Sequence, residues 1–150
     1  MVLLSILARR DAHLTVKVLV KFKRRRRRKY AIRGYYDAQK SPQGRIGYRS
    51  KNPELRIMQF LDKCERVILW HYETARIDYV VGRGLRKRQR FTIVDFEVIL
   101  DDGTMLLIEG KAKNFYWKFR RKRKAIESWC AKHDHKFLLV FDTDKEIKLP

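Results

Sequence analysis

Acidic residues are scarce in this chain of 150 residues. It contains 17 Asp and Glu against 37 Lys and Arg, so its net charge is +20 and its pI is about 10.4. An imbalance of this size predicts a polyanionic partner, most simply nucleic acid. A membrane surface is the competing polyanion, but the charge is spread over much of the chain rather than over one amphipathic helix, which argues against it.

Cysteine and long apolar runs are also rare. Cys64 and Cys130 are far apart and form no CxxC pair, so we expect reduced core cysteines of a cytosolic protein rather than a disulfide framework. No apolar run approaches the roughly 18 residues of a membrane span. The apolar residues 1–7 are too short for a signal peptide, and their arginines follow rather than precede them. The length predicts one domain, which we expect in the cytoplasm.

The N-terminal third is dominated by basic residues. Residues 13–23 alternate between apolar and basic side chains, which predicts a half-buried strand with a basic outer face. An unbroken run of arginines and one lysine follows at 24–29 and is too densely charged to pack. Because arginine binds phosphate in a bidentate manner, we expect a nucleic-acid-binding arm, with a solvated segment or a nuclear-import signal as alternatives. Residues 30–47 read as a linker, so residues 1–47 precede a core at 48–150.

The core has alternating helical and extended patterns. Asn52-Pro53-Glu54 is a helix start, with Asn52 as the cap and Pro53 in the first helical position. The predicted order is a helix, a strand, a short strand, a basic loop, a hairpin, a helix and a buried parallel strand, at residues 53–66, 67–73, 77–81, 82–90, 91–113, 115–133 and 137–141. This order predicts an α/β fold with a mixed sheet flanked by helices.

The hairpin at 91–113 carries charges in otherwise apolar strands. A three-residue loop at 101–103 places Asp95 opposite Glu109, whose Cβ atoms would then be roughly 4.5–5.5 Å apart. Two carboxylates at that distance repel each other unless a cation lies between them. Lys111 is two residues after Glu109 and shares its face of the sheet. A two-residue turn would instead place Asp95 opposite Gly110, but we favour the first register.

Two carboxylates and one ammonium group on one spot are typical of a site for a hard divalent cation. Oxygen ligands suit Mg²⁺ or Mn²⁺, and an adjacent lysine can handle a proton or orient a phosphate. The alternative is that Asp95 and Glu109 are structural partners of the abundant basic residues.

The pattern resembles the PD-(D/E)xK nuclease superfamily, whose restriction-endonuclease-like core has the order αβββαβ. Its motif corresponds to Asp95 and Glu109-Gly110-Lys111, with Glu54 on the first helix, and the resemblance covers residues 48–141. The sequence looks most like the phage Holliday junction resolvases of the endonuclease I type, because Tyr48-Arg49-Ser50 precedes the helical glutamate. The TnsA-type end-cutting nucleases of transposons come second.

The resemblance implies a homodimeric Mg²⁺-dependent DNA endonuclease that acts on branched DNA in recombination. It implies that Asp95, Glu109 and the Gly110 carbonyl bind one metal ion, that Glu54 helps to hold a second, and that Lys111 orients or activates water. We also expect several residues to contact nucleic acid: Arg24, Arg25, Arg26, Arg27, Arg28, Lys29, Arg49, Ser50, Lys113, Arg120 and Arg121. A non-catalytic nucleic-acid-binding protein and an RNA-binding or RNA-cleaving domain remain as alternatives.

Overall fold

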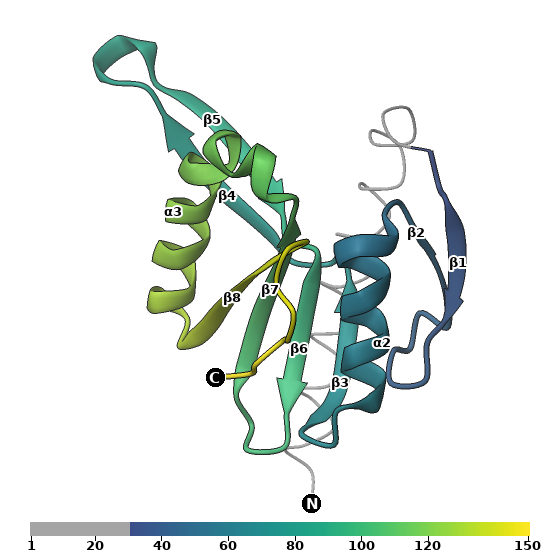
Figure 1. Ribbon diagram of the computed structural model, residues 1–150. Helices are drawn as coiled ribbons and strands as arrows, with labels where there is room; N and C mark the ends of the chain where they lie inside the picture. Colours follow the sequence, from purple (N-terminus) through teal and green to yellow (C-terminus); the bar gives the residue numbers. More distant parts are fainter. Residues whose placement is uncertain (1–30) are drawn as a thin grey trace, which may run out of the picture. The chain divides into compact units, whose positions relative to one another are not determined.

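A four-stranded mixed sheet forms the centre of the fold (Figure 1). The computed structural model describes residues 31–150, so the predicted strand at 13–23 and the arginine run lie outside the described residues. The sheet order is β3-β6-β7-β8, and only the β7–β8 pair is parallel. The strands are β3 (Val67–Tyr72), β6 (Phe96–Leu100), β7 (Met105–Lys111) and β8 (His135–Phe141).

One helix covers each face of this sheet. Helix α2 (Arg56–Lys63) buries its apolar stripe in one core cluster, which also contains Leu106 and Ile108 of β7. Helix α3 (Tyr116–Lys132) packs in a second cluster around Leu107. Because successive side chains of a strand point to opposite faces, β7 is buried on both sides. The predicted α/β class with a mixed sheet and flanking helices is therefore confirmed.

The start of the first helix differs from the prediction. Ser50 rather than Asn52 is the cap, since its side chain accepts a hydrogen bond from the Glu54 amide at 3.4 Å. Asn52 has an extended backbone, and residues 51–55 form an irregular wide turn, η1 (Lys51–Leu55), before α2 begins at Arg56. The side chain of Asn52 instead donates to the carbonyl of Asp142 at 2.7 Å. A contact with the far end of the chain thus replaces the capping role.

Residues 34–48 form a hairpin, so the prediction of a linker at 30–47 is wrong for this part. Strands β1 (Gly34–Asp37) and β2 (Arg45–Tyr48) are antiparallel. Ile46 and Tyr48 are buried in the cluster of α2. The compact unit accordingly spans Ile32–Pro150.

A third hairpin projects beyond the central sheet (Figure 1). It consists of β4 (Arg76–Val81) and β5 (Arg88–Ile93), joined by a turn that contains the short 3₁₀ helix η2 (Gly84–Arg86). The basic loop predicted at 82–90 is therefore partly strand. The continuous strand predicted at 91–100 is wrong as well, because β5 and β6 belong to different sheets and the chain turns between Ile93 and Phe96.

The C-terminal elements agree with the sequence patterns in most respects. The 3₁₀ turn η3 (Lys113–Phe115) leads into α3, and β8 is parallel to β7 as predicted. Strand β8 is less buried than predicted, since it is an edge strand in which Val140 alone is fully buried. Both cysteines are free. Within residues 31–150, no helix combines the length and apolarity that a membrane crossing requires.

Candidate active site

The register of the β6–β7 hairpin brings the two predicted carboxylates together. Phe96 pairs with Ile108, and the Leu100 amide donates to the Thr104 carbonyl at 3.0 Å across a three-residue loop. Gly103 in this loop has a φ of +81°, the left-handed conformation that favours glycine. Asp95 precedes Phe96 and Glu109 follows Ile108, so the predicted opposition is confirmed.

Each of the two carboxylates accepts a hydrogen bond from a main-chain amide on the other side of the hairpin. The Asp95 amide donates to Glu109 Oε2 at 3.2 Å, and the Gly110 amide donates to Asp95 Oδ2 at 2.9 Å. The Asp95 carbonyl accepts from the Glu73 amide at 2.8 Å, which fixes the chain at the turn between β5 and β6. These contacts position both carboxylates without a third acidic group. Their orientation is therefore set by main-chain hydrogen bonds.

Lys111 supplies the positive charge of the site. Its Nζ lies 2.5 Å from Glu109 Oε1, and the Glu109 side chain is only 4% exposed. The ammonium group also lies 5.2 Å from the centre of the Phe119 ring of α3, a cation–π distance. The helix thus closes the site from one side and limits where the ammonium group can move.

Burial and like charge perturb all three groups. Burial raises the pKa of Asp95 well above its usual range, and the neighbouring Glu109 raises it further. Burial also raises the pKa of Glu109, although Lys111 opposes the shift. Burial by itself would lower the pKa of Lys111, but Asp95 and Glu109 outweigh burial and raise it. A buried carboxylate pair with one shared cation is the environment expected for a site that binds further positive charge.

Glu54 is directed to the same site by the turn before α2. Its Oε2 accepts from the Arg49 amide at 2.8 Å and from the Tyr72 hydroxyl at 3.0 Å. Its charge also contributes to the raised pKa of both Asp95 and Lys111, so it belongs to their electrostatic neighbourhood. Asp95, Glu109 and Lys111 of the predicted motif are therefore brought together, whereas Glu54 is held by Arg49 and Tyr72 and acts on them through its charge.

Gly110 allows the turn before α2 to approach β7. A Cβ atom at this position would lie 2.7 Å from Pro53 Cγ and 3.1 Å from Ile57 Cδ1. The first of these distances is shorter than real Cβ contacts, so any side chain would push the turn outward. Because the same turn carries Glu54, the absence of a side chain at Gly110 sets how closely that carboxylate approaches the strand of Glu109.

The predicted nucleic-acid contacts have varied surroundings. The Arg49 guanidinium forms a bidentate ion pair with Glu73 at 2.6 and 3.1 Å, which raises its pKa. Ser50 caps the turn of Glu54. The Lys113 amide donates a hydrogen bond to Asp142 Oδ1 at 2.9 Å, and Lys113 is exposed. Arg120 and Arg121 are exposed on α3, whereas Arg24–Lys29 lie outside the described residues.

Three residues at the site were not predicted. Tyr72 holds Glu54, Glu73 holds Arg49, and Lys122 of α3 is close enough to Glu109 to lower its pKa. Tyr72 lies in a strand predicted from apolar content alone, and its hydroxyl gave no separate signal. Lys122 lies within a basic run, so the sequence could not indicate which of its members would affect the carboxylates.

The donor set suits a hard cation, but the described residues hold no ready-made cluster. Among residues 31–150, no three His, Cys, Asp or Glu side chains lie close enough together to hold a metal ion. Glu109 supplies a buried carboxylate and Asp95 a partly buried one, and Lys111 neutralises part of their charge. Oxygen donors of this kind match the preference of Mg²⁺ and Mn²⁺. The predicted metal ion thus fits the chemistry of the pair.

Comparison of the sequence with models of known protein families, and with curated protein sequences, finds no match.

Proposed function

We propose that this protein is a metal-dependent DNA endonuclease of the PD-(D/E)xK type, with a restriction-endonuclease-like core. The observation that carries the proposal is the pair of carboxylates at Asp95 and Glu109, with Lys111 against one of them. Two such groups in an apolar sheet are costly unless they serve a cation. The order α2, β3, β6, β7, α3, β8 matches the αβββαβ order of that superfamily, with β4–β5 as an addition.

Asp95, Glu109 and the Gly110 carbonyl would hold Mg²⁺ or Mn²⁺, with Glu54 beside them. A bound divalent ion would supply charge neutralisation at the phosphate and would lower the pKa of bound water. The chain's own residues supply the rest. Main-chain hydrogen bonds fix both carboxylates, so the ligands do not need to reorganise when the cation arrives.

Lys111 has the position needed to orient a water molecule or a phosphate oxygen. Its ammonium group stays protonated at neutral pH because Asp95 and Glu109 raise its pKa. We therefore assign Lys111 the role of orienting group and hydrogen-bond donor rather than general base. Phe119 limits its movement from the side of α3.

The substrate we propose is branched DNA, such as a four-way junction. The net charge of +20 supports a polyanionic partner, and symmetric cutting of two strands with one site per chain implies a homodimer. Cleavage of transposon ends, as by TnsA-type nucleases, is the nearest alternative within the same chemistry.

One observation favours a second candidate, a nucleic-acid-binding protein without catalysis. The 2.5 Å ion pair between Lys111 and Glu109 already compensates one buried carboxylate. In that case Asp95 and Glu109 are structural, and no metal ion is needed. The two candidates differ in what the carboxylates do, so both can be tested with the same variants.

The test is cleavage of a four-way junction in Mg²⁺, together with binding to the same junction in EDTA. Asp95→Asn and Glu109→Gln keep hydrogen-bond acceptors for the Gly110 and Asp95 amides, so we expect both variants to fold. Each should reduce the cleavage rate at least ~100-fold, since transition-state contacts of this kind contribute about that much. Lys111→Met should reduce it by a similar factor.

Binding in EDTA should change less than about threefold in all three variants, because affinity for DNA depends mainly on basic residues elsewhere. Glu97→Gln is the matched control. Glu97 is a partly buried carboxylate of β6, two residues after Asp95, and accepts a hydrogen bond from the Thr74 hydroxyl at 3.1 Å, so the loss of its charge should leave cleavage unchanged. Junction cleavage at the wild-type rate by Asp95→Asn would assign the carboxylates to a structural role.

A further inference from the structure

The turn of the β4–β5 hairpin is a strongly basic, exposed segment. Five of the residues at 83–90 are basic and all are exposed: Arg83, Arg86, Lys87, Arg88 and Arg90. Leu85 at the same turn is completely exposed. Within residues 31–150, none of these five cations forms an ion pair with a carboxylate, so their charge is available to a partner.

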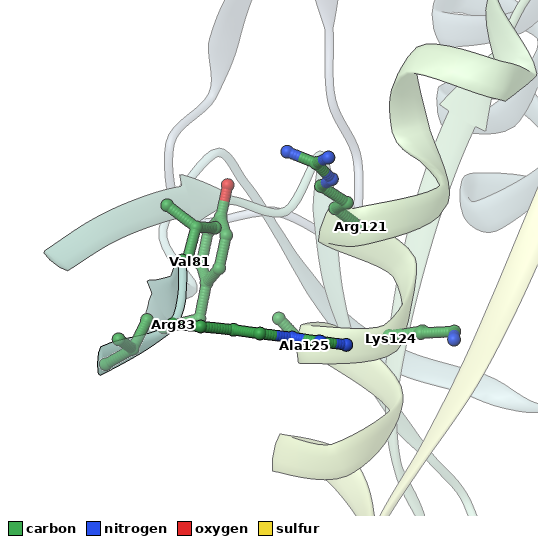
Figure 2. Close-up of a pocket in the computed structure, with 8 residues that line it drawn as sticks. Val81, Arg83, Arg121, Lys124 and Ala125 are labelled. Atoms are coloured by element: carbon green, nitrogen blue, oxygen red, sulfur yellow. The ribbon is translucent and has the colours of Figure 1, made fainter. Parts of the chain in front are cut away.

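A groove separates this hairpin from helix α3 (Figure 2). Its volume is about 530 Å³, and residues of both elements line it. Figure 2 shows the Arg83 side chain extending from the hairpin toward Ala125, while Arg121 projects from the helix at the same opening. Two guanidinium groups therefore meet at this groove, one carried by the hairpin and one by the helix.

The charges of this groove differ from those nearby. Arg123 on the same helix is bound by Glu127 and by the Tyr116 hydroxyl, both at 2.6 Å. Among the described residues, Arg83 and Arg121 have no such carboxylate partner. Cations that are not paired within the protein keep their full attraction for a phosphate backbone.

The walls of the groove are regular secondary structure. The hairpin is an antiparallel ladder of six residue pairs, from Arg76 opposite Ile93 to Val81 opposite Arg88. Ile77 near its base is buried in the same cluster as Phe119 and Ile126 of α3. The hairpin ladder and the packing of its base against α3 thus place the two sides of the groove next to each other.

The base of the hairpin adjoins the candidate active site. The Val94 amide donates to the Ala75 carbonyl at 2.9 Å, and the next pair joins Glu73 to Asp95. Six strand residues at about 3.3 Å each give a reach of roughly 20 Å from Asp95 to the basic turn. This length matches about six base pairs at 3.4 Å per step.

We propose that the groove between the β4–β5 hairpin and α3 binds the phosphate backbone of a duplex DNA arm, with the basic turn at its outer end about six base pairs from the phosphate at the carboxylates. Binding in the groove depends on charge and shape alone, whereas the stated distance rests on the proposed function of Asp95 and Glu109. The groove would hold the arm of a branched substrate while its branch point lies near the carboxylates.

The experiment compares Arg83→Gln/Arg121→Gln with a matched control, Lys132→Gln/Lys136→Gln. The control removes two exposed cations that do not line the groove. Binding of a labelled four-way junction is measured by fluorescence anisotropy in EDTA at several salt concentrations. We expect the groove variant to lose at least tenfold in affinity and the slope of log K against log salt to fall by about 1.8, which corresponds to two phosphate contacts. The control should lose less than threefold.

The length of the DNA arms provides the second readout. With arms of four base pairs, each closed by a hairpin loop so that the junction stays paired, the basic turn is out of reach, so the difference between wild type and groove variant should be smaller than with arms of twelve base pairs. Equal losses in the groove variant and the control, or a difference that does not depend on arm length, would overturn the proposal. The same measurement on single-stranded DNA and on duplex RNA is the third readout, and a loss confined to either of these would overturn the proposal in favour of another polyanion. Binding is measured in EDTA, so it does not depend on cleavage. If the wild type did not cleave DNA, the nuclease proposal would be refuted, and the groove proposal would still be decided by the binding data.

Discussion

Asp62 of α2 is the hydrogen-bond acceptor that holds the β1–β2 hairpin to the rest of the fold. It accepts from the Tyr36 hydroxyl at 2.8 Å, from the amides of Gln39 and Lys40 at 2.8 and 3.0 Å, and from Trp70 Nε1 at 2.7 Å. The carboxylate thus joins the hairpin, the helix and strand β3. We predict that Asp62→Asn weakens this junction.

The expected magnitude follows from the number of donors. All four groups that contact Asp62 donate hydrogen bonds. The side-chain oxygen of an asparagine can accept about two of these bonds, whereas its amide group is itself a donor and cannot accept the other two. Each hydrogen bond to a charged acceptor contributes about 1.5–3 kcal/mol, and partial exposure reduces this. The loss of two bonds should therefore lower the free energy of unfolding by about 2 kcal/mol, which is a decrease in Tm of roughly 6 °C for a chain of this size.

The effect should also depend on pH. Burial alone would raise the pKa of Asp62, but the hydrogen bonds from Gln39, Trp70, Lys40 and Tyr36 outweigh burial and lower it. A carboxylate with a lowered pKa in the folded state contributes stability above its unfolded value of about 3.9, and this stability is lost as the pH falls through the folded pKa. The difference between wild type and Asp62→Asn should therefore be largest at neutral pH and should shrink below about pH 4.

Urea unfolding followed by circular dichroism at pH 7 and pH 3 measures both effects. Asp37→Asn is the matched control, because Asp37 is 83% exposed and its nearest cation, Arg45, is 4.0 Å away. The control should change the free energy of unfolding by less than about 0.5 kcal/mol. If Asp62→Asn were as mild as the control at pH 7, the hairpin would not depend on this carboxylate and our reasoning would be refuted.

Two further predictions concern the candidate active site. Asp95→Asn should leave the Tm in EDTA unchanged or raise it by up to about 3 °C, because the substitution removes the repulsion from Glu109 and retains the Gly110 hydrogen bond. Scanning fluorimetry would measure the change in Tm. A clear decrease would show that the charge of Asp95 is itself structural. Gly110→Ala should destabilise the protein by about 1–3 kcal/mol in urea, because its Cβ would lie 2.7 Å from Pro53 Cγ. A loss below about 0.5 kcal/mol would mean that the turn moves aside at little cost.

The sequence predicts those parts of the fold that short-range chemistry determines. The Asp101–Gly103 turn sets the register of β6 and β7, because Gly103 allows the conformation that a three-residue loop needs. That register alone places Asp95 beside Glu109. The apolar periodicity of α2 and α3 identifies their buried faces as well.

The remaining features depend on contacts between distant residues. Strands β1 and β2 have four residues each, and their stability comes from Asp62 and the α2 cluster rather than from a pattern of their own. The chain turns after Ile93 without a glycine or a proline. Hydrogen bonds to Ala75 and Glu73 produce this turn instead. Ser50 rather than Asn52 is the cap because the Asn52 side chain donates a hydrogen bond to the Asp142 carbonyl. No local pattern could indicate these partners.

The contact between Gly110 and Pro53 has a consequence for how this chain should be compared with other sequences. The middle residue of a Glu-x-Lys motif is usually treated as free to vary. Here a methyl group at that position would overlap the ring of Pro53, so the two positions should change together during evolution. A relative with Ala or Val at the middle position should carry a smaller residue, or a shifted turn, before its first helix. Covariation of this pair would be a more specific signature of common ancestry than the three-letter motif.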